Sequence, residues 1–446
     1  MSEEPPASGS PRPIRPPRQA PSVYRRRQAG VAAAALLLGL VVLLGLIKAI
    51  GALGSDGSTR STGSAGAGAD SSPKGTSTTT STTTTTTVEV AAPELTPDRA
   101  QGAEGSSGQT GLVRVQALGG KTMSPKSVVA SSKGVVFAQN MMYHHTISVF
   151  SAEGALVRTI PDAVNLAEYG IKGHPGVSKG APVEMAFSPD GKTAWVSNYS
   201  MYGDGFGPEG SDKCSPGDGT DPSYLYRIDV EKLTITNVIA VGAVPKYVAA
   251  TPDGSKVLVS NWCTWDLSIV DTRTNTEIKR VPLGGRYPRG IAASGDSKMA
   301  YVAIMGSDRI VSVDLATFEA KTFASPGAGP RHIVISPDSK TLYVSNNRGG
   351  NVVRIDRATG NVTGKVATGS QPRSMAISGD GEALYVVNYN SATMTKVKAA
   401  DMSVMQTVQT DHHPIGITYE PTLRRVWVAN YGGRVLVFDD SRLLAD

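Results

Sequence analysis

The stretch PRHIVISPDSKTLYVSN, residues 330–346, decides the fold, because close variants of it return along the chain at a nearly fixed interval. PKYVAATPDGSKVLVSN begins at Pro245 and PRSMAISGDGEALYVVN begins at Pro372. From Pro245 to Pro414, the first prolines of successive units are spaced 43, 42, 42 and 42 residues apart. The seven units begin at Pro125, Pro182, Pro245, Pro288, Pro330, Pro372 and Pro414. A period of this length indicates one supersecondary unit repeated seven times.

Each unit is expected to contain four short strands. In the unit that begins at Pro330, the alternation of apolar and polar residues predicts strands at 333–335, 341–345, 352–355 and 361–367. Between the first two, Ser-Pro-Asp-Ser provides a proline and an aspartate that both favour a tight turn. The sequence therefore predicts an all-β fold, a seven-bladed propeller of four-stranded antiparallel blades spanning residues 111–446.

The last unit supplies only three strands, because the chain ends soon after residues 435–438. The segment LVRVQA at 112–117 has the pattern of a strand but belongs to no unit. We expect this N-terminal strand to pair into the seventh blade and close the ring, which protects an edge that would otherwise attract other chains.

Three short motifs carry a family resemblance: LYVSNN at 342–347, AWVSNY at 194–199 and VWVANY at 426–431. They resemble the repeats of the YVTN-type propeller family, and the resemblance covers about residues 112–440 and all seven units. It implies the propeller fold. For function it implies a range of activities, since members serve as surface proteins, binding proteins and occasionally lactonase-like proteins.

The N-terminal part has a different composition. Residues 29–47 carry no charge and are followed by Lys48 and a further apolar stretch, so residues 29–53 are predicted to form a transmembrane signal-anchor helix. Arg25, Arg26 and Arg27 precede it, which predicts a cytoplasmic Pro/Arg-rich tail at residues 1–28 and an extracytoplasmic propeller in a single-pass cell-membrane protein. A cleaved signal peptide is the alternative, and the length of the apolar run argues against it.

Residues 54–110 are rich in Gly, Ser and Thr and are predicted to form a disordered stalk, whose glycosylation the sequence does not decide. The net charge of +6 is also distributed unevenly, because residues 111–446 sum to only +4. The propeller is therefore mildly basic, and its overall charge gives little support for a nucleic-acid partner.

Two gaps between units exceed the period. The gap of 63 residues after Pro182 places an insertion at 201–223, and the gap of 57 after Pro125 places another at 161–181. We expect both on one face of the propeller, flanking the second blade. Cys214 in the first of these and Cys263 in the following blade are the two cysteines of the chain, and they are expected to form a disulfide in an oxidising compartment.

The residue after the repeat proline is basic in five of the seven units: Lys126, Lys246, Arg289, Arg331 and Arg373. These residues begin the innermost strands, so they are expected to surround one mouth of the central channel and focus positive potential there. The pattern predicts a site for an anionic small molecule, glycan or peptide. Pairing with acids of neighbouring turns is the alternative.

Histidines are expected on the same face, and the pairs His144–His145 and His412–His413 lie in blades that become neighbours when the ring closes. Imidazole is a common ligand of transition metals, so these four residues form a candidate metal site. Exposed loop histidines are the alternative, because no His-x-His spacing occurs on a single strand. No other cofactor is predicted, and the acidic residues of the 201–223 insertion lack the spacing of a Ca²⁺ loop.

Taken together, these features favour a binding or sensor module over an enzyme without deciding between them. The sequence has no nucleophile elbow and no HExxH motif. A lactonase-like or metal-assisted hydrolase is the alternative, and polyanion or single-stranded nucleic-acid binding is the second. For the latter, stacking surfaces are available from Tyr199, Tyr202, Trp262, Trp265 and Tyr389. The sequence does not predict the oligomeric state.

Overall fold

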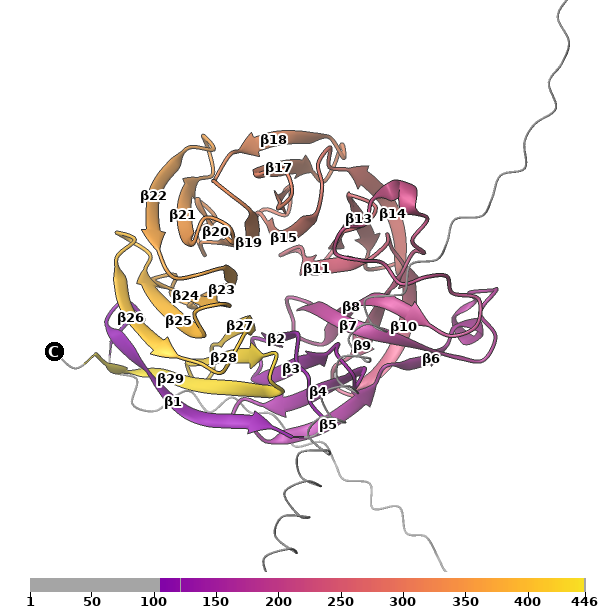
Figure 1. Ribbon diagram of the computed structural model, residues 1–446, viewed down its shortest axis with the longest axis horizontal. Helices are drawn as coiled ribbons and strands as arrows, with labels where there is room; N and C mark the ends of the chain where they lie inside the picture. Colours follow the sequence, from indigo (N-terminus) through magenta and orange to yellow (C-terminus); the bar gives the residue numbers. More distant parts are fainter. Residues whose placement is uncertain (1–104, 121, 445–446) are drawn as a thin grey trace, which may run out of the picture. The chain divides into compact units, whose positions relative to one another are not determined.

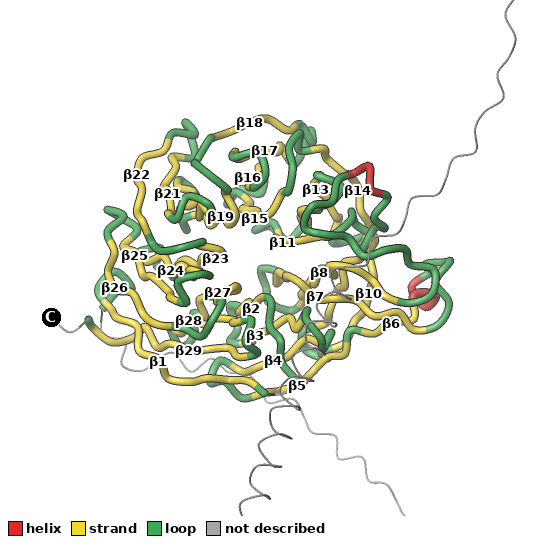
Figure 2. The backbone as a smooth tube through the Cα atoms, viewed as in Figure 1, coloured by secondary structure: helices red, strands yellow, loops and turns green. Residues whose placement is uncertain are grey.

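The computed structural model describes residues 105–120 and 122–444, which form seven antiparallel sheets arranged around a ring (Figure 1). Six of these sheets have four strands and one has five. Helical structure among the described residues is limited to two short 3₁₀ segments, η1 (Leu166–Tyr169) and η2 (Pro216–Asp218) (Figure 2). The predicted seven-bladed, all-β propeller is confirmed.

The blades are numbered along the chain. The first strand of each blade lies nearest the centre of the ring, except in blade 2, where β7 is the inner strand and β6 lies farther out (Figure 1). Blades 3 to 6 follow the repeat most closely. They contain β11 (Pro245–Ala250), β12 (Lys256–Asn261), β13 (Asp266–Asp271), β14 (Thr276–Pro282); β15 (Pro288–Ala293), β16 (Met299–Ile304), β17 (Arg309–Asp314), β18 (Ala320–Ala324); β19 (Pro330–Ile335), β20 (Thr341–Asn346), β21 (Asn351–Asp356), β22 (Val362–Ala367); and β23 (Pro372–Ile377), β24 (Ala383–Asn388), β25 (Thr393–Lys398), β26 (Val404–Gln409).

The other three blades differ in detail. Blade 1 contains β2 (Ser127–Ala130), β3 (Val135–Asn140), β4 (Thr146–Ser151) and β5 (Leu156–Pro161). Blade 2 contains β6 (Ala163–Asn165), β7 (Val177–Phe187), β8 (Thr193–Tyr202), β9 (Tyr224–Asp229) and β10 (Thr234–Ala240). Blade 7 contains β27 (Pro414–Glu420), β28 (Arg425–Asn430), β29 (Arg434–Leu443) and β1 (Thr110–Gly119).

The local chemistry of each unit explains its strand bounds. In blade 5, β19 begins at Pro330, three residues earlier than predicted, because a proline can occupy the first position of a strand. The turn to β20 is held by Asp338, whose Oδ1 accepts hydrogen bonds from the Ser336 hydroxyl at 2.6 Å and the Lys340 N–H at 3.1 Å. Strand and turn residues thus agree with the repeat read from the sequence.

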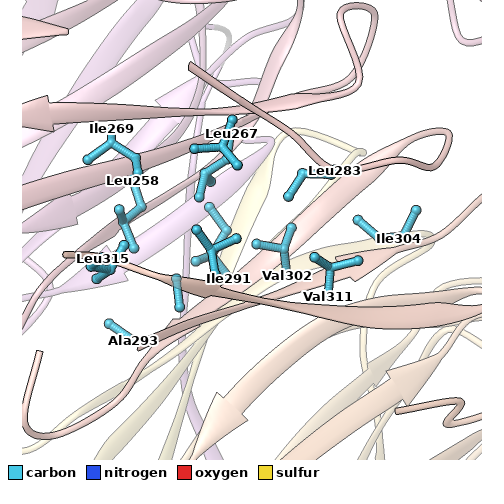
Figure 3. Close-up of a cluster of buried hydrophobic side chains, with 13 residues drawn as sticks. Leu258, Leu267, Ile269, Leu283, Ile291, Ala293, Val302, Ile304, Val311 and Leu315 are labelled. Atoms are coloured by element: carbon cyan, nitrogen blue, oxygen red, sulfur yellow. The ribbon is translucent and has the colours of Figure 1, made fainter. Parts of the chain in front are cut away.

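The hydrophobic core lies between neighbouring blades. The cluster in Figure 3 joins Leu258 and Leu267 of blade 3 to Ile291 and Val302 of blade 4, all 3% exposed or less. Burying one such side chain contributes about 1.5–3 kcal/mol. Each blade shares a cluster of this kind with the next, so the blades pack on one another all around the ring.

The inner strands also approach one another closely. A Cβ atom on Gly290 would lie 2.7 Å from the His332 Cα, and one on Gly416 would lie 2.7 Å from the Ser127 Cα. No side chain fits at these two positions without moving the adjacent strand. Glycine therefore allows the narrow centre of the ring that positions the site.

Blade 2 carries the two insertions, and the structure brings them together. The ring of His174 stacks on Phe206 with a centroid distance of 3.9 Å, so the insertion before β7 contacts the insertion after β8. The first insertion also contributes the fifth strand, β6, which pairs with the start of β7. The sequence predicted loops here, since a strand of three residues is too short to show an alternating pattern.

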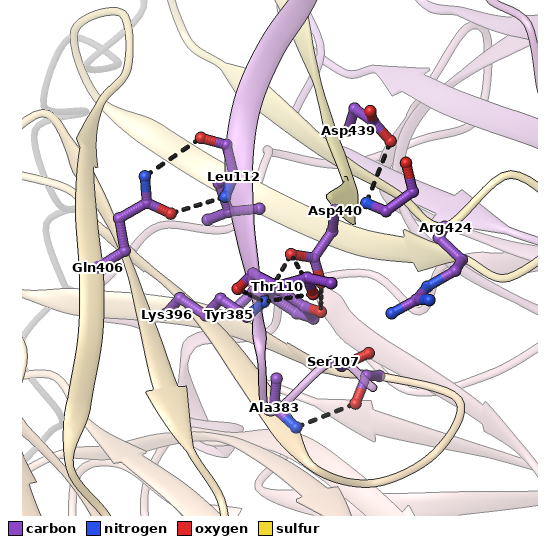
Figure 4. A network of polar contacts seen from close by, with 12 residues as sticks. Ser107, Thr110, Leu112, Ala383, Tyr385, Lys396, Gln406, Arg424, Asp439 and Asp440 are labelled. Carbon is purple, nitrogen blue, oxygen red and sulfur yellow. Dashed lines mark hydrogen bonds and ion pairs between the residues drawn. The ribbon is translucent and has the colours of Figure 1, made fainter. Parts of the chain in front are cut away.

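Strands from both ends of the described region share blade 7. β1 pairs antiparallel with β29, with Thr110 opposite Leu443. Beside this pair, Lys396 Nζ lies 2.5 Å from Asp440 Oδ1 and donates to the Thr110 carbonyl at 2.6 Å, while the Tyr385 hydroxyl donates to the other carboxylate oxygen of Asp440 (Figure 4). We call Lys396, Asp440, Thr110 and Tyr385 the seam cluster; all four are 0% exposed.

The predicted tail, the predicted membrane helix and most of the predicted stalk fall in residues 1–104, outside the described residues. Within the part that the structure describes, no helix is long and apolar enough to cross a membrane. The first described residues contact the propeller, since the Ser107 N–H donates to Asp380 Oδ2 at 2.9 Å.

Candidate functional site at the channel mouth

The structure places the five basic residues at equivalent positions of five blades. Each either directly precedes the inner strand or is its second residue, because each follows the repeat proline. Four have exposed fractions of only 4–7%, and Arg373 is half-buried. We call this set the mouth ring: Lys126, Lys246, Arg289, Arg331 and Arg373.

The charges of the mouth ring act on one another. Burial lowers the pKa of Lys126 to about 7; Glu184 opposes this shift, and Arg289, Arg331 and Arg373 add to it. Burial also lowers the pKa of Lys246, and Arg289 lowers it further. The five cations therefore form a single electrostatic site rather than five separate side chains.

Counter-charges are fewer than cations. Glu184 Oε1 lies 3.4 Å from Lys126 Nζ, and Asp212 Oδ1 lies 3.8 Å from Lys246 Nζ on a side chain that is 87% exposed. Within residues 105–120 and 122–444, the guanidinium groups of Arg289 and Arg331 form no ion pair and no hydrogen bond with another side chain. Five basic side chains thus face two carboxylates, and the three arginines alone outnumber these acids in a largely dehydrated place.

Aromatic rings cover three of the cations. Lys246 Nζ lies 4.2 Å from the ring centroid of Tyr199, the Arg289 guanidinium 5.7 Å from that of Trp262, and the Arg373 guanidinium 3.5 Å from that of Tyr389. Such contacts contribute about 0.5–2 kcal/mol each and leave the charge in place. Of the predicted stacking residues, Tyr202 packs edge-on against His145 and Trp265 against Tyr287.

The second insertion is fixed beside this site. Cys214 and Cys263 form the predicted disulfide, with their Cα atoms 5.1 Å apart. Cys263 follows Trp262, and Cys214 lies two residues after Asp212. The Tyr199 hydroxyl donates to the Gly210 carbonyl at 3.1 Å. The insertion therefore brings one carboxylate to the blade 3 side of the mouth and holds it there.

A cavity of about 240 Å³ lies within the inner strands, and the residues that follow four of the five ring positions, Ser127, Tyr247, His332 and Ser374, help to line it. They include Tyr247 and His332, whose rings meet edge-on with centroids 5.0 Å apart. This cavity was not predicted from the sequence. One feature of the sequence could have indicated the cavity: the second residue after each repeat proline is polar or glycine in all seven units. These residues are Ser127, Glu184, Tyr247, Gly290, His332, Ser374 and Gly416.

The four candidate metal-ligating histidines have separate surroundings. His145 Nδ1 lies 2.6 Å from the Gly180 carbonyl of blade 2, and His413 stacks on Tyr389 at a centroid distance of 4.4 Å. His412 lies beside His413, with their centroids 6.4 Å apart, and His144 is half-buried. In the described part of the chain, no three His, Cys, Asp or Glu side chains are grouped closely enough to hold a metal ion.

Comparisons with known proteins give the fold alone. No family model matches the sequence, and no curated protein matches it. Among solved structures, the chain is similar to hydrazine synthase of Kuenenia stuttgartiensis, with a TM-score of 0.57 and 17% identity over 74% of this chain and 99% of that chain. Because 1790 chains of solved structures match, this likeness identifies a widespread architecture and no particular activity.

Proposed function

We propose that this protein is a binding or sensor module that holds an anionic ligand at the mouth ring. One observation carries the proposal: five basic side chains, three of them arginines, lie at one end of the inner strands and face only two carboxylates among the described residues. Taking charges out of water costs several kcal/mol each unless a partner repays it. An anion at the mouth supplies the missing acceptors for Arg289 and Arg331.

The arginines suit a ligand with two or more oxygens on one group. A planar guanidinium donates two parallel hydrogen bonds to a carboxylate or phosphate, and such charge-assisted bonds are the stronger kind. The rigid inner strands hold the donors in place before the ligand arrives, which reduces the ordering cost of binding. A small molecule, an acidic glycan or an acidic peptide side chain meets these requirements.

The cellular setting is part of the proposal. The apolar segment 29–53 and the arginines before it support a single-pass membrane anchor with the propeller outside the cytoplasm. The Cys214–Cys263 disulfide agrees with this side of the membrane, because disulfides persist in oxidising compartments. The repeat motifs support membership of the YVTN-type family.

Titration calorimetry of the purified full chain with sodium sulfate at low ionic strength tests the proposal. The variant Arg289→Met/Arg331→Met/Arg373→Met keeps side-chain bulk and removes three charges. Its control, Lys232→Met/Lys321→Met/Lys340→Met, removes three charges from side chains that are 68–81% exposed. We expect the ring variant to lose sulfate binding and the control to keep it. Equal affinity in both variants would overturn the proposal.

A further inference from the structure

The cavity lies next to the mouth ring. Inner strands contribute neighbouring residues to both parts: Lys246 to the ring and Tyr247 to the cavity in β11, and Arg331 to the ring and His332 to the cavity in β19. Glu184 lines the cavity and also contacts Lys126 Nζ at 3.4 Å. None of the five ring residues lines the cavity itself, so Glu184 is the contact through which the cavity adjoins the ring.

The cavity wall combines apolar surface with polar groups that lack partners. Met185, Met375 and Ile417 provide apolar surface. His332 is 9% exposed, and its Nδ1 has no hydrogen-bond partner among the described residues. The Tyr247 hydroxyl also forms no hydrogen bond in that part of the chain, but its oxygen, unlike His332 Nδ1, is not fully buried. A buried polar atom normally finds a partner, so the imidazole is available to hydrogen-bond a guest, and the accessible Tyr247 hydroxyl can do the same.

The protonation state of His332 determines which guests fit. Burial lowers its pKa to about 3, and the positive charges of Arg331, Arg289 and Lys126 act in the same direction. The imidazole is therefore neutral near pH 7, with one nitrogen able to donate and the other able to accept a hydrogen bond. It suits an uncharged hydroxyl or carbonyl group and gives no charge to a second anion.

The volume sets the size of the guest. A dry apolar cavity of about 150 Å³ holds benzene. The cavity here, at about 240 Å³, has room for one such ring with a substituent.

We propose that the ligand is a small amphipathic organic acid. Its carboxylate lies on the mouth ring, and its uncharged body, of about the size of one aromatic ring, fills the cavity and hydrogen-bonds His332 and Tyr247. This inference rests on the proposed function and narrows the ligand class, because a bare inorganic anion occupies only the ring.

The test compares four probes by titration calorimetry of the full chain: 4-hydroxybenzoate, acetate, sulfate and 4-hydroxybenzyl alcohol. We expect 4-hydroxybenzoate to bind about tenfold more tightly than acetate, and the alcohol, which lacks the carboxylate, to bind more weakly than 4-hydroxybenzoate. Tyr247→Phe and His332→Phe should each weaken 4-hydroxybenzoate binding about threefold to tenfold, the effect of one lost hydrogen bond. Sulfate binding should change less than about twofold, since these variants leave the ring intact.

A cavity-filling variant gives an independent test. Val334 lines the cavity and is half-buried, so Val334→Phe should block the body of the organic acid. Retained sulfate binding shows that this variant is folded. The inference fails if 4-hydroxybenzoate binds no better than acetate, or if Val334→Phe leaves its affinity unchanged, while sulfate still binds. Failure of sulfate and every acid to bind the wild type would instead overturn the proposed function, and this inference with it.

Discussion

The protein buries two groups of charged side chains, and the two groups differ in balance. In the seam cluster, Lys396 and Asp440 neutralise each other and further bonds come from Thr110 and Tyr385. In the mouth ring, the basic side chains outnumber the nearby carboxylates by five to two in the described part of the chain. The seam cluster is neutralised without a ligand, whereas an anionic ligand would reduce the excess of basic groups in the mouth ring.

Burial of charge by itself therefore does not identify a functional site in this molecule. Burial lowers the pKa of Lys396, but the carboxylate of Asp440 opposes that shift within a closed network. At the mouth, the neighbours of Arg331 add to the effect of burial, because Arg289 and Arg373 also lower its pKa. The ratio of basic to acidic groups, rather than how deeply they are buried, distinguishes a structural network from a binding site here.

The largest expected effect comes from breaking the seam cluster. Lys396→Met leaves the buried carboxylate of Asp440 without its cation, which should lower the free energy of unfolding by about 3–5 kcal/mol. Urea unfolding of the full chain measures the change. The double variant Lys396→Met/Asp440→Leu removes both charges and should recover most of the loss. A single variant as stable as the wild type would show that the pair is not a closed network.

The opposite pattern is expected at the mouth. Arg331→Met removes a repelled cation, so the free energy of unfolding should stay the same or rise, while sulfate affinity should fall roughly tenfold to a hundredfold, the effect of losing a charged hydrogen bond. Calorimetry and urea unfolding of the same sample give both numbers. Loss of stability with unchanged affinity would make the mouth ring a structural network like the seam.

The pH dependence of binding should be visible at the mouth. Lys126 has a pKa of about 7 and carries its charge below that value, so sulfate affinity should fall severalfold as the pH rises through about 7. Sulfate itself does not titrate in this range. Calorimetry at pH 6 and pH 8 measures the change, and Lys126→Met should remove it. An unchanged pH profile in that variant would assign the titration to another group.

The smallest effect is expected from the insertion. Asp212 is exposed and lies 3.8 Å from Lys246 Nζ, where it competes with an incoming anion. Asp212→Asn should raise sulfate affinity about twofold, in keeping with the small contribution of exposed ion pairs. Asp204→Asn, an exposed acid of the same insertion, is the matched control and should have no effect. Equal gains from both variants would indicate a general charge effect.

The sequence predicted the blades and the ring positions because both depend on the repeat. A constant period makes the residue after each proline structurally equivalent, so five basic residues in that position had to gather at one end of the inner strands. The disulfide was predictable for a similar reason, since both cysteines lie in the same kind of loop in adjacent blades. Local pattern and repeat length were sufficient for these features.

Other features depend on contacts that no repeat encodes. Glu184 contacts Lys126 although the two residues are 58 positions apart in the sequence, because their inner strands pack side by side. Only the packed blades show that contact. The fifth strand of blade 2 and the stacking of His174 on Phe206 arise inside the insertions, which have no counterpart in the other units. The surroundings of His145 and His413 likewise follow from loop paths rather than from the period.

The pairing of β1 with β29 also constrains how the protein is made. Thr110 and Asp440 contact each other across 330 residues, so β1 leaves the ribosome long before its partner exists. At about 5–20 residues per second, β1 waits roughly 20–60 s with its edge unpaired. Blades 1 to 6 can form during this interval, but the circle is completed only after synthesis reaches β29. Premature termination within blade 7 should therefore yield an open, aggregation-prone arc instead of a slightly smaller propeller.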